Sequence, residues 1–169
     1  DRPRHKLIIE ELKRLNVKLK LISDGDVAGA LLVTEPSFEV DIFLGIGGGP
    51  EGVLAAAALD AYDCFFQGRF IFDNENDIKV ANTMGIKDLT KKYELKEIVK
   101  GDSLFCATGI TNSDILKGIS INNNTYASET LITHKSSNYK KVVRLVKSLD
   151  EWYLFLVKNG PKEISIKIL

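Results

Sequence analysis

Two acidic loops that contain glycine carry the residues best suited to chemistry. They are Asp24-Gly25-Asp26 and the run Gly47-Gly48-Gly49-Pro50-Glu51-Gly52. Consecutive glycines leave main-chain amides exposed, and the start of a following helix adds partial positive charge, so an anion such as a phosphate is favoured there. The carboxylate of Glu51 would repel that phosphate unless a divalent cation lay between them, and hard oxygen ligands suit Mg²⁺ or Mn²⁺. The second loop therefore favours metal-bridged phosphate chemistry over dinucleotide binding.

Each loop also has a purely structural interpretation. The glycine run satisfies the spacing G-x-G-x-x-G, but Pro50 and Glu51 fall inside it, and a tight turn followed by a helix-start glutamate explains it as well. Aspartates on either side of a glycine form turns, and Asp26 can cap a helix that begins at Val27. The functional interpretation of Asp24 and Asp26 is contact with sugar hydroxyls or support of a metal ion. The pattern by itself leaves both interpretations open.

A short cationic segment, Arg2-Pro3-Arg4-His5, is a third candidate. The proline stiffens it, and the guanidinium of Arg4 can bind a phosphate through two parallel hydrogen bonds. A frayed basic terminus is the alternative. His5 and His134 have no partner at metal-ligand spacing, so both are interpreted as ordinary polar residues.

The surrounding patterns predict alternating helices and strands that would position these loops. Apolar spacing predicts helices over His5–Asn16, Val27–Val33, Val53–Tyr62, Asp77–Met84 and Lys91–Val99. Apolar or alternating runs predict strands over Val17–Ile22, Val40–Ile46, Cys64–Phe72 and Ser103–Thr108. Loops that follow strands gather at the carboxyl edge of an α/β sheet, so Asp24, Asp26, Gly48 and Glu51 are expected to face one crevice.

The pattern changes from Gly118 onward and predicts antiparallel hairpins. The predicted strands are Ile119–Ile121, Tyr126–His134, Lys140–Val146 and a terminal Ile164–Leu169, while Trp152–Val157 suits either a helix or a strand. The basic residues of the last hairpin are expected to form a solvated face; they are Lys135, Lys140, Lys141, Arg144 and Lys147. The whole order predicts one α/β domain over residues 1–169, a layered sandwich with a mixed sheet.

Composition narrows the class of protein. The 169 residues carry 23 basic and 23 acidic side chains, so no global field favours nucleic acid or an anionic membrane. No stretch has the length of a membrane span, and no signal peptide is recognised. Cys64 and Cys106 lie in apolar runs and are interpreted as buried free thiols of a cytoplasmic protein.

Several short motifs, in order and at characteristic separations, are spread over most of the chain. They are Asp1-Arg2-Pro3-Arg4-His5, Leu21–Ala28, Gly45–Val53, Gln67-Gly68-Arg69, Ala107–Thr111 and Glu129-Thr130-Leu131. Taken together they resemble the class II fructose-1,6-bisphosphatases of the bacterial type. The resemblance implies metal-dependent hydrolysis of the 1-phosphate of fructose 1,6-bisphosphate, giving fructose 6-phosphate for gluconeogenesis. Photosynthetic members also use sedoheptulose 1,7-bisphosphate, and a homo-oligomer, a dimer or tetramer, is expected.

The resemblance also implies a role for each matching residue. Glu51 would ligate the catalytic Mn²⁺ or Mg²⁺, and Gly48 would offer its backbone to the substrate. The three residues Asp24, Gly25 and Asp26 would contact sugar hydroxyls. Arg2, Pro3 and Arg4 would hold the substrate, with Arg4 on its distal phosphate.

The chain departs from the family in length. Members are about twice as long, and their remaining metal carboxylates and catalytic threonine region lie in an amino-terminal half that is missing here. No catalytic residue can therefore be assigned, the missing half is an expected partner, and this chain alone is expected to be inactive or nearly so. The tail after Lys147 departs from the family pattern and is assigned no role.

Two other functions remain open on sequence grounds. One is a non-catalytic sugar-phosphate or nucleotide-binding module that uses the glycine loop and Arg4 without a metal. The other is a structural interaction piece whose acidic loops are only turns. The metal response of a Glu51→Gln variant separates both from a phosphatase.

Overall fold

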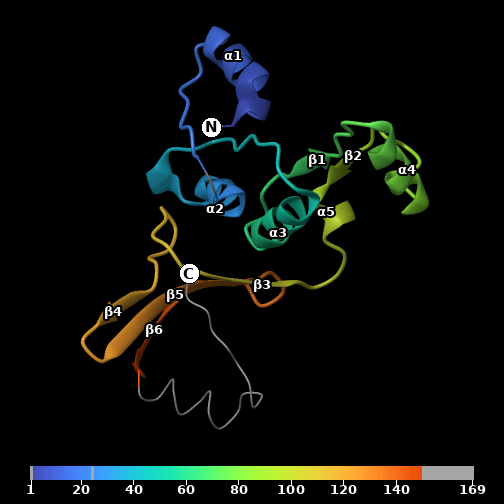
Figure 1. Cartoon of the computed structure of the whole chain (residues 1–169). Helices are drawn as coiled ribbons and strands as arrows, with labels where there is room; N and C mark the ends of the chain where they lie inside the picture. Colours follow the sequence, from blue (N-terminus) through green and yellow to red (C-terminus); the bar gives the residue numbers. More distant parts are fainter. Residues whose placement is uncertain (1, 24, 150–169) are drawn as a thin grey trace. The chain divides into compact units, whose positions relative to one another are not determined.

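The computed structural model in Figure 1 describes residues 2–23 and 25–149. The chain divides into two compact units. The first runs from the N-terminal residues to Phe105 and includes Thr133–Lys140, and the second contains Cys106–Ile132 and the chain from Lys141 on. Asp24 and the elements predicted over 152–157 and 164–169 lie outside the described residues. The prediction of one domain stays a prediction.

The predicted helices are confirmed in the first unit, with small shifts of their ends. The helices are α1 (Lys6–Arg14), α2 (Asp26–Leu31), α3 (Gly49–Asp60), α4 (Glu75–Thr83) and α5 (Leu95–Ile98), with 3-10 turns η1 (Pro3–His5), η2 (Leu32–Thr34) and η3 (Pro36–Phe38). The prediction for 91–99 is right only in its second part, because Glu94 and Glu97 form a reciprocal capping box that starts the helix at Leu95.

Helices α2 and α3 pack together and form the core of the first unit. Their contact surfaces are rich in small residues, which let two helix backbones approach closely. Ala56 and Ala58 of α3 are completely buried, and Ala30 and Leu31 of α2 are nearly so. This packing holds the beginnings of both helices, where the acidic loops lie, in one structural unit.

The strands form two sheets, and the hairpins predicted after Gly118 are largely confirmed. In the first unit β1 (Gln67–Arg69) pairs antiparallel with β2 (Lys92–Glu94), so the strand predicted over 64–72 is reduced to its centre. The other sheet contains β3 (Leu104–Thr108), β4 (Ser120–Asn122), β5 (Thr125–His134) and β6 (Tyr139–Ser148). Its order is β3-β5-β4, and β6 also pairs with β5. Helices with antiparallel sheets confirm the predicted α/β class.

Two strand predictions are wrong for this chain. Residues 17–22 and 40–46 form neither helix nor strand. An alternating pattern indicates which face of a segment would be buried, but a strand also needs a neighbouring backbone for its hydrogen bonds. Within residues 2–23 and 25–149, residues 40–45 have no such neighbour.

The cysteines are only partly as predicted. Both are free thiols, but Cys64 is half-buried and Cys106 is exposed. Cys106 lies on β3, where side chains alternate between the two faces and Phe105 takes the buried one. Partial burial raises the pKa of the Cys64 thiol, and the neighbouring Asp63 carboxylate raises it further.

The turn between β5 and β6 is attached to the end of α3 by a lysine. The Lys135 ammonium lies 3.1 Å from Asp60 Oδ1 and 3.0 Å from Asp63 Oδ1, and the Asp60 side chain is only 9% exposed. A carboxylate at a helix C-terminus is disfavoured by the helix dipole, so Asp60 depends on this cation. The basic residues of the last hairpin are exposed, as expected, but Lys135 also pairs with these two carboxylates and Lys140 lies over the Tyr62 ring.

A polar network stabilises the same turn. Ser136 Oγ donates to Asp102 Oδ2 at 2.8 Å, and His134 Nε2 lies 2.8 Å from the same oxygen. The other ring nitrogen, Nδ1, lies 2.7 Å from Ser137 Oγ. The Ser136 hydroxyl and His134 hold the pKa of Asp102 below its ordinary value. His134 is thus engaged in a hydrogen-bond network that fixes a turn.

We predict that Lys135→Met lowers the Tm by about 3 °C near neutral pH, because it leaves the buried Asp60 carboxylate uncompensated. Thermal unfolding followed by circular dichroism measures the effect. Adding Asp60→Asn should restore part of the loss, and Lys140→Met, on β6 just after the turn, is the matched control. Equal losses for the two lysine variants would contradict the assignment.

The stabilisation by Lys135 should have a defined pH window. Hydrogen bonding to Lys135 lowers the pKa of Asp63, so this contribution is present above the ordinary aspartate pKa and disappears as the pH falls through the lower, folded value. Pairing with Asp63 and Asp60 raises the pKa of Lys135, so its contribution is present below the ordinary lysine pKa and disappears as the pH rises through the raised value. The Tm difference should therefore hold between about pH 4 and pH 10 and shrink outside that range.

Candidate functional site

The glycine loop ends at a helix start that has no side-chain cap. Gly48 is the N-cap residue of α3, with extended backbone angles of φ −68° and ψ 152°, and it offers no side chain to the first-turn amides. Pro50 lies in the first turn, where its missing N–H costs nothing. Uncapped amides and the positive end of the helix dipole make this position suitable for an anion.

Two carboxylates lie against consecutive residues of this loop. A Cβ atom added at Gly47 would lie 2.5 Å from Oδ2 of Asp26, and one added at Gly48 would collide with Oε2 of Glu51. Asp26 is the first residue of α2 and is half-buried, whereas Glu51 is in the first turn of α3 and exposed. A side chain at either loop position would therefore displace the end of a carboxylate side chain.

The cationic segment reaches the same loop from a distant part of the sequence. The Arg4 Nε group donates a hydrogen bond to the carbonyl oxygen of Ile46, the residue before Gly47. The Ile46 N–H donates to Nε2 of His5 at 2.8 Å. Two adjacent side chains of η1 thus hold both polar groups of Ile46, and the remaining guanidinium nitrogens of Arg4 stay beside the glycine loop.

The structure therefore brings together most of the residues predicted for the site. Arg4, Asp26, Gly48 and Glu51 meet around the Ile46–Gly48 backbone, and Gly25 precedes α2 as its N-cap residue. Arg2 and Pro3 lie exposed at the start of η1. The roles of all these residues remain predictions. The contact of His5 could not be predicted from the sequence, because its partner is 41 positions away and no local spacing signals the contact.

A divalent cation would find only part of its ligand set in this region. Mg²⁺ and Mn²⁺ prefer carboxylate, carbonyl and water oxygens, and the exposed Glu51 carboxylate fits that preference. Among the described residues, no three His, Cys, Asp or Glu side chains group so as to hold a metal ion. Glu51 is therefore suited to contribute one ligand to a site that other groups complete.

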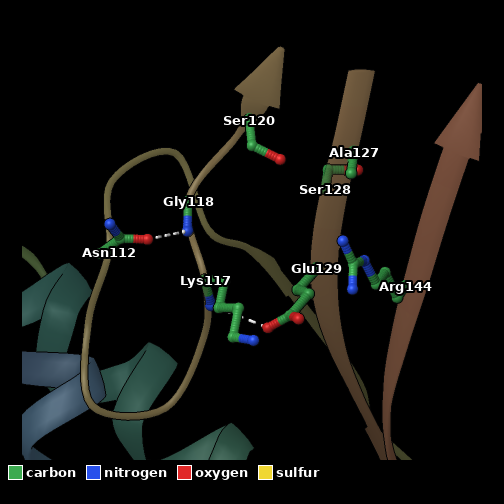
Figure 2. A pocket seen from close by; sticks show the side chains of 8 residues that line it. All are labelled: Asn112, Lys117, Gly118, Ser120, Ala127, Ser128, Glu129 and Arg144. Carbon is green, nitrogen blue, oxygen red and sulfur yellow. Dashed lines mark hydrogen bonds between the residues drawn. The ribbon is translucent and has the colours of Figure 1, made fainter. Parts of the chain in front are cut away.

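A cavity lies in the second unit and is unrelated to the predicted site residues. It has a volume of about 110 Å³ and is lined, as Figure 2 shows, by Asn112, Lys117, Gly118, Ser120, Ala127, Ser128, Glu129 and Arg144. Asn112 Oδ1 accepts from the Gly118 N–H at 2.9 Å, and Glu129 Oε2 accepts from the Lys117 N–H at 2.8 Å. The first bond closes the loop between β3 and β4 on itself, and the second attaches it to β5, which is a structural task.

Comparisons with known proteins identify the same family that the sequence motifs resemble. Residues 1–149 match the family described as bacterial fructose-1,6-bisphosphatase, glpX-encoded, and the chain belongs to this family. No helix among the described residues combines the length and apolar character needed to cross a membrane.

Curated relatives give a consistent result. The chain is 38% identical over 169 aligned residues to fructose-1,6-bisphosphatase class 2 of Haemophilus influenzae, covering 92% of this chain and 50% of the relative. It is 36% identical to fructose-1,6-bisphosphatase 1 class 2 of Escherichia coli, covering 99% and 52%. A relative from Trichodesmium erythraeum, named D-fructose 1,6-bisphosphatase class 2/sedoheptulose 1,7-bisphosphatase, is 34% identical, covering 89% and 48%. The chain thus spans about half the length of the curated relatives it matches.

We predict that His5→Ala loosens the glycine loop by removing the acceptor of the Ile46 N–H. One hydrogen bond contributes about 1 kcal/mol, so exchange of the Ile46 amide hydrogen should become about fivefold faster. Hydrogen exchange measured by NMR tests this. The neighbouring Lys6→Ala is the control, since Lys6 pairs with Glu10 on the surface of α1. An unchanged exchange rate in His5→Ala would show that His5 does not hold the loop.

Proposed function

We propose that this chain forms part of a metal-dependent fructose-1,6-bisphosphatase and contributes the sugar and distal-phosphate contacts together with one metal ligand. The observation that supports this most directly is the convergence of Arg4, Asp26 and Glu51 on the Ile46–Gly48 backbone. Membership of the fructose-1,6-bisphosphatase family and the names of the relatives give the substrate class.

The substrate end of the site is formed by the first two segments. Arg4 binds the distal phosphate, because the side of its guanidinium that does not contact Ile46 can donate two parallel hydrogen bonds. Arg2 and Pro3 flank this contact. Asp24, Gly25 and Asp26 accept and orient the sugar hydroxyls. Binding energy from the distal phosphate then orients the phosphate that reacts.

The metal end of the site is formed by the start of α3. Glu51 ligates Mn²⁺ or Mg²⁺, and Gly48 offers backbone groups to the substrate beside it. The cation, when bound, neutralises phosphoryl charge and lowers the pKa of a bound water. The positive end of α3 contributes further stabilisation of negative charge at the same place.

The remaining parts of the enzyme lie outside this chain. We propose that the other half of a full-length enzyme supplies the missing metal ligands and the catalytic residues, and that the enzyme is a cytoplasmic homo-oligomer, a dimer or tetramer. Sedoheptulose 1,7-bisphosphate is a second candidate substrate, because the Trichodesmium erythraeum relative carries that name.

The decisive experiment joins this chain to the missing half. A chimera in which these residues replace the aligned half of the Haemophilus influenzae relative should release phosphate from fructose 1,6-bisphosphate when Mn²⁺ or Mg²⁺ is present, whereas this chain alone should stay at background. A chimera that folds and binds the sugar phosphate without any metal, yet hydrolyses nothing, would favour a binding module. Strong hydrolysis by this chain alone would contradict the proposed division of the site.

We predict that Glu51→Gln lowers kcat/KM of the chimera about 100-fold or more, because a neutral amide is a poor ligand for a hard cation. The Mn²⁺ concentration needed for half-maximal activity should rise with it. Glu75→Gln is a matched control, since Glu75 occupies the first turn of α4 as Glu51 does that of α3. If both variants keep the activity and metal response of the parent chimera, Glu51 is not a metal ligand.

A further inference from the structure

The segment of residues 40–45 has an unusual combination of sequence and environment. It lies between η3 and the glycine loop and reads Val-Asp-Ile-Phe-Leu-Gly. Phe43 is half-buried, whereas the side chains on either side of it are open, with Ile42 72% and Leu44 56% exposed. A segment with one covered face and one uncovered apolar face is typical of a strand whose second covering layer is absent.

The backbone of this segment has no partner among the described residues. Glu39 N–H bonds to Pro36 on one side, and Ile46 bonds to Arg4 and His5 on the other. Between them, residues 40–45 make no hydrogen bond with any residue in 2–23 or 25–149. Main-chain N–H and C=O groups beside apolar side chains are a template for another strand.

The covered face of the segment is anchored on α2. A Cβ atom added at Gly29 would lie 2.8 Å from Cε2 of Phe43 and would also collide with Cδ1 of Ile22. The segment before α2 and the segment after it thus both rest on the same helix. Strand–helix–strand order is the connection that joins parallel strands of a sheet, and it leaves positions in that sheet for further strands.

We infer that residues 40–45 dock a β-strand from the half of the full-length enzyme that lies outside this chain. This rests on the proposed function, since the relatives contain about as much chain again as the part matched here. The incoming strand bonds to the free backbone groups and covers Ile42 and Leu44 with apolar side chains. Because residues 40–45 lead directly into Ile46 and the glycine loop, docking also stiffens that loop.

Hydrogen exchange tests this docking directly. In this chain alone at low concentration, the amide hydrogens of residues 41–45 should exchange nearly as fast as in an unfolded peptide. In the chimera with the Haemophilus influenzae half, they should exchange at least 100-fold more slowly. The amides of β4, which are paired with β5 in this chain, serve as the internal reference for both proteins.

A pair of variants tests the side-chain part of the inference. In the chimera, Ile42→Asp should make the amide hydrogens of residues 41–45 exchange at least tenfold faster. It should leave the Tm of this chain alone unchanged, because the carboxylate would be buried only by the docked strand. Ile121→Asp is the matched control, since Ile121 is 67% exposed on β4 and already has a backbone partner in Tyr126.

The other results either overturn the inference or separate it from the proposed function. Protection of residues 41–45 in this chain alone at low concentration shows a partner within the chain. Protection that grows with the concentration of this chain shows that a second copy is the occupant. A chimera that hydrolyses fructose 1,6-bisphosphate while residues 41–45 stay unprotected keeps the proposed function and refutes the docking. A chimera that is protected but inactive keeps the docking and refutes the proposed function.

Discussion

The candidate site depends on the hydrogen bonds that Arg4 and His5 make with the backbone of Ile46. These bonds join two segments that are 41 residues apart in sequence and place a guanidinium beside a glycine-rich helix start. Without them, the cationic turn would be an ordinary exposed terminus and the glycine loop an ordinary turn. A permanent cation next to uncapped amides is a stronger anion site than either feature alone.

The two helices that follow the acidic loops give the site its carboxylates. The small-residue packing of α2 against α3 holds their first turns in one unit, so that Asp26 and Glu51 lie against neighbouring glycines. At its other end, α3 ends in the buried Asp60, which is bound by Lys135 from the turn between β5 and β6. The C-terminal end of α3 is therefore held by a charged pair, and the packing of α3 on α2 supports Glu51 at its other end.

Local chemistry explains which elements could be predicted from the sequence. The start of α3 follows from Pro50 and Glu51, and the β4–β5 hairpin follows from its asparagine turn, where Asn123 has a positive φ of 51°. The strands predicted over 17–22 and 40–46 are absent because a ladder needs a second backbone, and periodicity says nothing of whether this chain contains it. The glycine run that follows residues 40–46 does begin with a loop, as predicted.

The sequence predicted that the two acidic loops, with Asp26, Gly48 and Glu51, face one crevice. It did not predict that Arg4 reaches the same backbone, because that contact with Ile46 joins segments that are far apart in sequence. His5 carried no local signal at all, and Lys135 looked like any surface lysine. Its pairing with Asp60 is set by where a turn meets a helix end, which no pattern in either segment records.

The central claim is that Asp26, Glu51 and the glycine loop surround one cation-bridged sugar phosphate. NMR spectra of this chain with fructose 1,6-bisphosphate and trace Mn²⁺, compared with Mg²⁺ as a diamagnetic reference, test it most directly. The account predicts that the paramagnetic ion broadens the amide signals of residues 25–26 and 47–52 together and leaves those of the β4–β5 hairpin sharp. Broadening that spares either group, or that follows exposed carboxylates all over the surface, would contradict it.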